Sequence, residues 1–161
     1  KMAAIGRSQA VIEFDLDGNI LDANENLLST MGYALDEICG QHHSIFVTAE
    51  ERESDAYRRF WEKLGRGEYD AGQYKRHAKD GREVWIQASY NPILDPSGKP
   101  FKVVKYATDI TAAKLRAADY EGQLKAISKA QAVIEFTTSG KIRRAQSVQM
   151  YLDDQFSRLD A

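Results

Sequence analysis

The sequence predicts an α+β domain: a five-stranded antiparallel sheet with short helices over one face, followed by a C-terminal linker helix. Three observations lead to this prediction. A hairpin motif lies near the N-terminus, apolar residues recur at helical spacing in the middle, and three long β-rich segments follow. Strands, then helices, then strands in this order are typical of a sheet whose helices gather on one face.

The first two strands are predicted on either side of a tight turn. Residues 10–14 form a short apolar run, residues 15–19 contain Asp-Gly, and residues 20–21 begin a second apolar run. Asp-Gly between apolar segments is a strong hairpin signal because both residues tolerate the positive φ that such turns need.

The middle of the chain is predicted to be helical. Apolar spacing over residues 27–31 and 35–38 indicates two short helices. Residues 48–51 have the form of a capping box, which we expect to open a helix carrying the apolar stripe of residues 56–64, with Gly65 and Gly67 closing it.

The rest of the domain is predicted to be three antiparallel strands. Residues 69–78, 84–91 and 101–108 are rich in β-forming side chains, and residues 79–82 and 95–99 supply the turns between them. These strands complete the five of the sheet.

A helix is predicted after the last strand, over residues 112–129. Its apolar seam steps by four and three residues for about two heptads, and consists of Ala113, Ala117, Tyr120, Leu124 and Ile127. Two interpretations stay open: a helix packed on its own domain, or one that dimerises and carries a signal.

An internal repeat follows this helix. The six residues Gln-Ala-Val-Ile-Glu-Phe occur at 9–14 and again at 131–136, an offset of 122 residues (131 minus 9). The repeat predicts tandem copies of one unit, with the second truncated or diverged. We therefore divide the chain into a domain at 1–111, a linker helix at 112–129 and a partial second copy at 130–161.

Composition excludes several function classes. The 22 basic and 24 acidic residues leave a formal net charge of −2, which gives no general attraction to nucleic acid or anionic membranes. One cysteine excludes an internal disulfide framework and a four-thiolate zinc site. No apolar run is long enough to cross a bilayer, so we expect a cytoplasmic protein without membrane contact.

Several motifs together resemble PAS domains, the sensory modules of bacterial receptors and kinases, continuously over residues 9–111. The resemblance is greatest to the tandem PAS modules of soluble methyl-accepting chemotaxis proteins. The motifs are Val11–Phe14, Asp17–Asn24, Met31–Tyr33, Glu37–Gly40, Lys79–Arg82, Trp85–Pro92 and Asp109–Thr111, with Gly40–Phe46 and Trp61–Leu64 closest to the chemotaxis proteins.

The resemblance implies a ligand pocket between the sheet and the helices. Alternation along the strand after Glu83 places Ile86, Ala88 and Tyr90 on its more apolar face, which we expect to line this pocket. Plain core packing of the same residues is the alternative.

One PAS subclass, the light-oxygen-voltage domains, forms a covalent flavin adduct. Alignment places His43 at the position of the reactive cysteine, Ile86 at the flavin-bonding asparagine and Ala107 at the glutamine of the last strand. Cys39 lies four residues too early, so adduct chemistry is rejected.

Haem b is a second possible cofactor, with His43 as the candidate axial iron ligand and the only metal-ligating residue that we expect. His43 could equally be a histidine hydrogen-bonded within the fold. His77 lies among Lys75, Arg76 and Lys79, which we interpret as a solvated basic face.

Non-covalent FAD is a third possibility, and a pocket without a cofactor is a fourth. Tyr57, Trp61 and Tyr90 offer aromatic surface for a flavin, and Asn24 offers an amide. Asn24 is also well placed to cap the helix that follows it, and the two aromatic residues of residues 56–64 also fit a helix core.

The resemblance implies a sensor rather than an enzyme, and no catalytic motif is present in the sequence. We expect Asp109, Ile110 and Thr111 to pass the state of the pocket to the linker helix and thence to a downstream signalling domain. A homodimer through that helix, or through pairing of the repeat strand at 132–136, is also expected. The alternatives are a ligand-free dimerisation module and the input unit of a histidine kinase or a cyclic-nucleotide enzyme.

Overall fold

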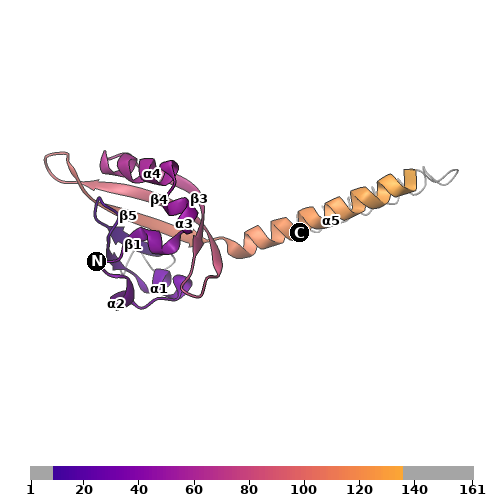
Figure 1. Cartoon of the computed structure of the whole chain (residues 1–161), viewed down its shortest axis with the longest axis horizontal. Coiled ribbons are helices and arrows are strands. Elements are labelled where there is room, and N and C mark those ends of the chain that lie inside the picture. The colour runs from indigo at the N-terminus through magenta and orange to yellow at the C-terminus, as the bar shows by residue number, and fades with distance from the viewer. Residues whose placement is uncertain (1–8, 136–161) are drawn as a thin grey trace. The chain divides into compact units, whose positions relative to one another are not determined.

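The computed structural model describes residues 9–135, with side chains through residue 130. The chain divides into two units, 1–112 and 113–161. The first unit contains the sheet and the short helices (Figure 1). Of the second unit the structure describes helix α5.

Five strands form one antiparallel sheet in the order β2-β1-β5-β4-β3. The predicted sheet is confirmed, and each strand lies within a few residues of its predicted bounds. The strands are β1 Ala10–Phe14, β2 Ile20–Ala23, β3 Asp70–His77, β4 Glu83–Leu94 and β5 Pro100–Asp109.

Pairing of β1 with β5 joins the two ends of the domain, because β1 lies between its hairpin partner β2 and the last strand. Strands β2 and β5 hydrogen-bond to the backbone of β1 from both sides. This short strand is therefore in the interior of the sheet, although it lies at the start of the described residues. Its inward side chains Ile12 and Phe14 are fully buried.

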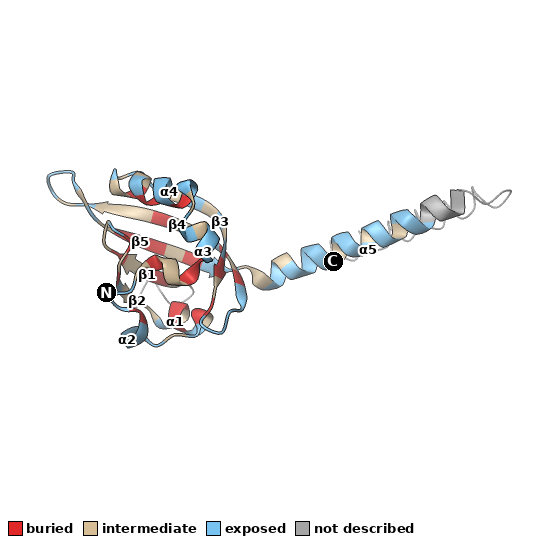
Figure 2. Ribbon diagram, in the orientation of Figure 1, coloured by how far each residue is buried: buried red, intermediate tan, exposed pale blue. Residues whose placement is uncertain are grey.

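Short helices connect β2 to β3. They pack with the inward residues of the sheet into one hydrophobic core, and Figure 2 shows buried residues on the strands and on the adjoining helices. The helices are α1 Glu25–Met31, α2 Leu35–Ile38, the 3₁₀ turn η1 His43–Phe46, α3 Ala49–Arg52 and α4 Asp55–Gly65.

The predicted capping box does not open the long helix. The hydroxyl of Thr48 accepts from the backbone N–H of Glu51, but this caps the single turn α3, and α4 begins separately with Ser54 as its N-cap. The prediction assigned the Thr48 cap to the helix that carries the apolar stripe. The stripe starts at Ala56, and in the structure it belongs to the separate helix α4.

Register places the small residues Ala10, Ala107, Ala88 and Gly72 opposite one another across four strands. Because their side chains are short, this row forms a shallow trough in the inner face of the sheet. The adjacent row contains Lys105, paired with Tyr90.

Helix α5, Thr111–Glu135, runs beyond the predicted end of the linker at 129. Residues 132–135, which repeat the sequence of β1, are therefore helical, and the predicted repeat strand is wrong for them. Strand β1 depends on two neighbouring strands, whereas a helix satisfies its own backbone locally. Phe136 and the rest of the predicted second copy lie outside the described residues.

The predicted seam of α5 is only partly covered. Tyr120, Leu124 and Ile127 are half-buried, whereas Ala113 and Ala117 are exposed. Dimerisation through this helix stays a prediction.

Candidate functional site

A small cavity lies between the inner face of the sheet and helix α1, over the trough of small residues. It holds about 20 Å³, room for about one water molecule. Ala10 and Ala107 form its floor, and its wall consists of Leu27, Thr30, Met31, Phe46, Arg76, Ile86, Lys105 and Asp109. We call this space the inner cavity.

Two cations lie in the wall of the inner cavity. Arg76 is 4% exposed and Lys105 is 3% exposed, values otherwise typical of core side chains. Alternation along β3 and β5 turns both residues inward with their apolar neighbours. The sequence-based interpretation of Arg76 as part of a solvated basic face is therefore wrong, because Arg76 lies on the opposite face of β3 from Lys75 and His77.

Arg76 is partly paired. One guanidinium nitrogen donates to Glu51 Oε1 at 3.2 Å and to the backbone oxygen of Lys75 at 2.9 Å, and the other donates to the Tyr90 hydroxyl at 3.1 Å. Its buried Nε has no hydrogen-bond partner among the described residues. Lys105 lies over the Tyr90 ring, with Nζ 4.9 Å from the centroid.

His43 is fully buried at the centre of a polar network. Its Nδ1 lies 2.8 Å from the Tyr57 hydroxyl and its Nε2 lies 3.2 Å from the Tyr90 hydroxyl. Because Tyr90 also accepts from Arg76, the contacts form one chain from Tyr57 through His43 and Tyr90 to Arg76 and Glu51.

One tautomer gives both ring nitrogens of His43 and the Tyr90 hydroxyl a matching partner. Arg76 can only donate, so the Tyr90 oxygen accepts from Arg76. The hydroxyl proton of Tyr90 is then free to be donated to His43 Nε2. Nδ1–H then donates to Tyr57. Burial, aided by the positive charge of Arg76, holds the pKa of His43 well below its usual value, so the imidazole is neutral.

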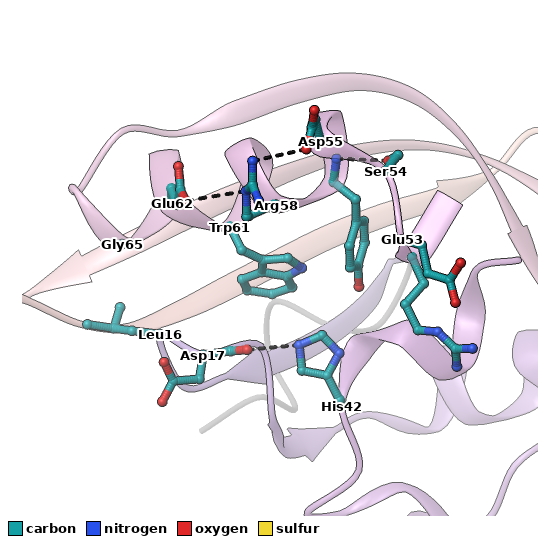
Figure 3. A pocket seen from close by; sticks show the side chains of 12 residues that line it. Leu16, Asp17, His42, Glu53, Ser54, Asp55, Arg58, Trp61, Glu62 and Gly65 are labelled. Atoms are coloured by element: carbon teal, nitrogen blue, oxygen red, sulfur yellow. Dashed lines mark hydrogen bonds and ion pairs between the residues drawn. The ribbon is translucent and has the colours of Figure 1, made fainter. Parts of the chain in front are cut away.

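A second, open groove of about 600 Å³ lies between α4 and the segment of Leu16, Asp17 and His42 (Figure 3). Tyr57 and Trp61 line it together with His42, whose Nε2 lies 2.8 Å from the backbone oxygen of Asp17. Arg58 bridges two carboxylates of the same helix on its rim. Since Tyr57 belongs both to this groove and to the buried network, the network runs between the groove and the inner cavity.

The structure separates the predicted site residues into distinct places. Ile86 lines the inner cavity, Ala88 lies in the row of small residues, and Tyr90 lies in the network. Tyr57 and Trp61 line the outer groove instead. That part of the predicted set does not form one pocket with the strand residues.

Asn24 lies at the start of α1 and has a structural role. Its Oδ1 accepts from the backbone N–H groups of Leu27 at 3.1 Å and Val11 at 3.0 Å, and its Nδ2 donates to the backbone oxygen of Gln9. It therefore ties α1 to β1 as the N-cap.

The described residues do not fit haem as they stand. Both ring nitrogens of His43 are within hydrogen-bond distance of tyrosine hydroxyls, so iron ligation would require one of these contacts to break. Between residues 9 and 135, no group of three or more His, Cys, Asp or Glu side chains could hold a metal ion.

A flavin would need a much larger inner cavity, because drug-sized ligands occupy pockets of roughly 300–1,000 Å³. Ile86 and Ala107, which stand at positions of flavin-bonding amides in light-oxygen-voltage domains, both line the cavity and offer no side-chain hydrogen bond. The buried polar groups of the cavity wall are instead the cations Arg76 and Lys105.

Arg76 and Lys105 are the site residues that the sequence-based reasoning missed. A signal was available, because alternation along residues 101–108 puts Lys105 on the same face as Val103 and Ala107. A charged residue at such an inward position predicts either a buried ion pair or a ligand contact.

The inner cavity also reaches the start of α5. Exposed Asp109 is one of its lining residues, and Asp109 Oδ1 accepts from the backbone N–H of Thr111 at 2.9 Å and from its hydroxyl at 2.6 Å. The Thr111 hydroxyl in turn accepts from the backbone N–H of Trp85 on β4, and Ile110 N–H donates to the Trp85 carbonyl.

No helix in the described part of the chain is long and apolar enough to span a membrane. This finding concerns the helices between residues 9 and 135.

Comparison with known protein families matches the chain to one family. Residues 20–107 match the family described as PAS fold. The chain belongs to this family, and the predicted resemblance is confirmed.

The chain is also similar to two curated proteins. The chain is 46% identical over 144 residues to the biofilm dispersion protein BdlA of Pseudomonas aeruginosa, covering 89% of the chain and 34% of the relative. It is 31% identical over 80 residues to the aerotaxis receptor of Escherichia coli, covering 50% of the chain and 16% of that protein. The chain thus spans about a third or less of these relatives.

A light-oxygen-voltage domain, solved in work on a flavin analogue, shares the fold. Its TM-score is 0.59 at 22% identity, covering 76% of this chain and 93% of that one.

Proposed function

We propose that this chain is the sensory PAS unit of a chemotaxis-type transducer, in which the state of the inner cavity is passed to α5 through Asp109. One observation carries this proposal: the residue that lines the cavity also holds the first residue of the helix, through two hydrogen bonds to Thr111. The two signalling relatives support the same class of protein.

The mechanism follows from these contacts. Thr111 is fixed from two sides, by Asp109 and by the backbone of Trp85 on the neighbouring strand. A ligand that displaces β5 relative to β4 would change this geometry and with it the start of α5, shifting the population of helix states. A downstream domain and a homodimer are parts of the same proposal.

The test is Asp109→Ala in the full-length transducer that contains this chain. Asp95→Ala is a matched control, since Asp95 Oδ1 makes the same kind of contacts to Ser97 N–H and its hydroxyl, but in the β4–β5 turn away from the cavity. We expect Asp109→Ala to abolish stimulus-dependent output and Asp95→Ala to preserve it. Unchanged output in Asp109→Ala, or equal loss in both variants, would refute the relay.

The cofactor is open to a simple measurement. The shared fold can hold a flavin, as the light-oxygen-voltage relative indicates, but the small inner cavity and the occupied nitrogens of His43 favour a colourless ligand here. We therefore expect an absorption spectrum of freshly purified protein with neither a Soret band nor flavin bands. Flavin bands that bleach with dithionite would establish FAD instead, and a Soret band would establish haem.

A further inference from the structure

We propose that the inner cavity binds a small organic monocarboxylate, with Lys105 and Arg76 holding its carboxylate. This inference rests on the proposed function, because it takes the inner cavity as the ligand site of the sensor. It adds the chemical class of the ligand, which neither the fold nor the relatives specify.

The first argument is the position of Lys105. Lys105 is 3% exposed and lines the cavity, yet among the described residues its ammonium group has no hydrogen-bond or ion-pair partner and contacts the Tyr90 ring. A buried ammonium group without an anion is costly to a fold. A ligand anion in the cavity would supply the missing partner.

The second argument is the charge balance of the site. Arg76 and Lys105 bring two positive charges, and Glu51, 3.2 Å from Arg76, offsets one of them. Asp109 also lines the cavity, but it is exposed and its Oδ1 already accepts from Thr111. The buried part of the wall is therefore left with one positive charge, which matches a monoanion better than a dianion such as phosphate. Burial, followed by the charge of Arg76, lowers the pKa of Lys105 well below its usual value, and a bound anion would oppose this effect.

The third argument is the geometry of the donors. Both cations flank Tyr90: Arg76 donates to its hydroxyl at 3.1 Å and Lys105 Nζ lies 4.9 Å from its ring centroid. The Arg76 Nε–H is unused, and the contact that the structure gives the Lys105 ammonium is with the Tyr90 ring. Two separate donors suit the two oxygens of a carboxylate, which accepts such charge-assisted bonds strongly.

The remaining wall selects for a small ligand. The floor is the row of Ala10 and Ala107, and the side facing α1 consists of Leu27 and Met31. With about 20 Å³ available, only a short apolar group can accompany the carboxylate, with flexible Met31 giving way. A short-chain carboxylate therefore satisfies the charge and the donors, and it fits the volume once Met31 shifts.

The experiment is a titration of the purified chain with sodium acetate, followed by amide chemical shifts of β5 in two-dimensional NMR. Acetamide, which has the same shape without the charge, and sodium chloride at equal ionic strength are the reference solutes. We expect saturable shifts around Lys105 and Ala107 with acetate alone. Equal shifts with chloride would overturn the assignment to a carboxylate, and equal shifts with acetamide would overturn the role of charge.

Lys105→Met tests the residue itself, because methionine keeps the length of the stem and removes only the charge. We expect acetate affinity to fall by about tenfold or more, as for loss of a charged hydrogen bond. Lys102→Met is the matched control: Lys102 lies on the outer face of the same strand and pairs with Glu13. Undiminished affinity in Lys105→Met would overturn the proposal, as would equal weakening in both variants.

This test is separate from the test of the proposed function. Binding is measured on the isolated chain and needs no signalling output. If acetate causes no saturable shifts but Asp109→Ala still abolishes output, the ligand class alone is refuted. If acetate binds but Asp109→Ala leaves output unchanged, the relay alone is refuted.

Discussion

Replacing Tyr90 with phenylalanine should destabilise the domain markedly, although it removes a single oxygen atom. Tyr90 is fully buried, and its hydroxyl joins His43 Nε2 at 3.2 Å to an Arg76 nitrogen at 3.1 Å. The phenyl ring keeps its packing, so the loss isolates the hydrogen bonds.

The magnitude follows from the two partners left behind. A buried polar group that loses its partner costs about 1–3 kcal/mol, and more when it is charged. Arg76 keeps its contacts to Glu51 and Lys75, and His43 keeps its contact to Tyr57, so each loss is partial. We expect the free energy of unfolding to fall by about 2–4 kcal/mol.

The measurement is urea unfolding followed by circular dichroism, with Tyr106→Phe as the matched control. Tyr106 lies on the outer face of β5, and its hydroxyl has no hydrogen bond among the described residues. The control should change by less than about 0.5 kcal/mol, as a typical surface substitution does. A Tyr90→Phe variant as stable as the wild type would refute the reasoning about the network.

Three further predictions concern the surroundings of this network. Gly18→Ala should cost about 1–3 kcal/mol in thermal unfolding, since φ is +89° and an added Cβ would lie 2.6 Å from His42 Nε2; an unchanged melting temperature would contradict this. Asn24→Ala should cost about 1–2 kcal/mol in urea unfolding through loss of the Leu27 cap, whereas Asn24→Asp should keep that cap and lose less. Because the pKa of His43 is lowered by burial, the unfolded chain binds the extra proton, and stability should fall as pH drops below about 6.5, by at most about 1.4 kcal/mol per pH unit. His43→Asn should show a smaller slope between about pH 5 and pH 6.5, and equal slopes would exclude His43 as the source.

Local chemistry was enough to predict most of the elements. The Asp-Gly turn at Asp17 and Gly18, the alternation of β4 and the spacing along α4 each depend on neighbours a few residues away. The local signals did not separate α3 from α4. Thr48 and Ser54 are both good N-cap residues, and the sequence does not show whether each begins its own helix. Motif resemblance extended these local signals to the family.

Sequence patterns alone were sufficient to predict the α+β class, the helical region, the strands and the PAS family. They could also have placed Lys105 on the inner face, because alternation is a property of one strand. The sequence could not show that residues 132–135, which are identical to part of β1, would be helical. A strand needs neighbouring strands to form, whereas without them the conformation follows local propensity.

The composition of the site, in contrast, depends on contacts between residues far apart in the sequence. His43 meets Tyr57, 14 residues away, and Tyr90, 47 residues away, and the β1–β5 pairing puts Ala10 beside Ala107. Such contacts arise from the order of strands in the sheet, which chain-local patterns do not encode. Burial then sets the charge state of these residues. Removal from water lowers the pKa of His43 and keeps it neutral, and it makes a charged Lys105 costly unless an anion binds beside it.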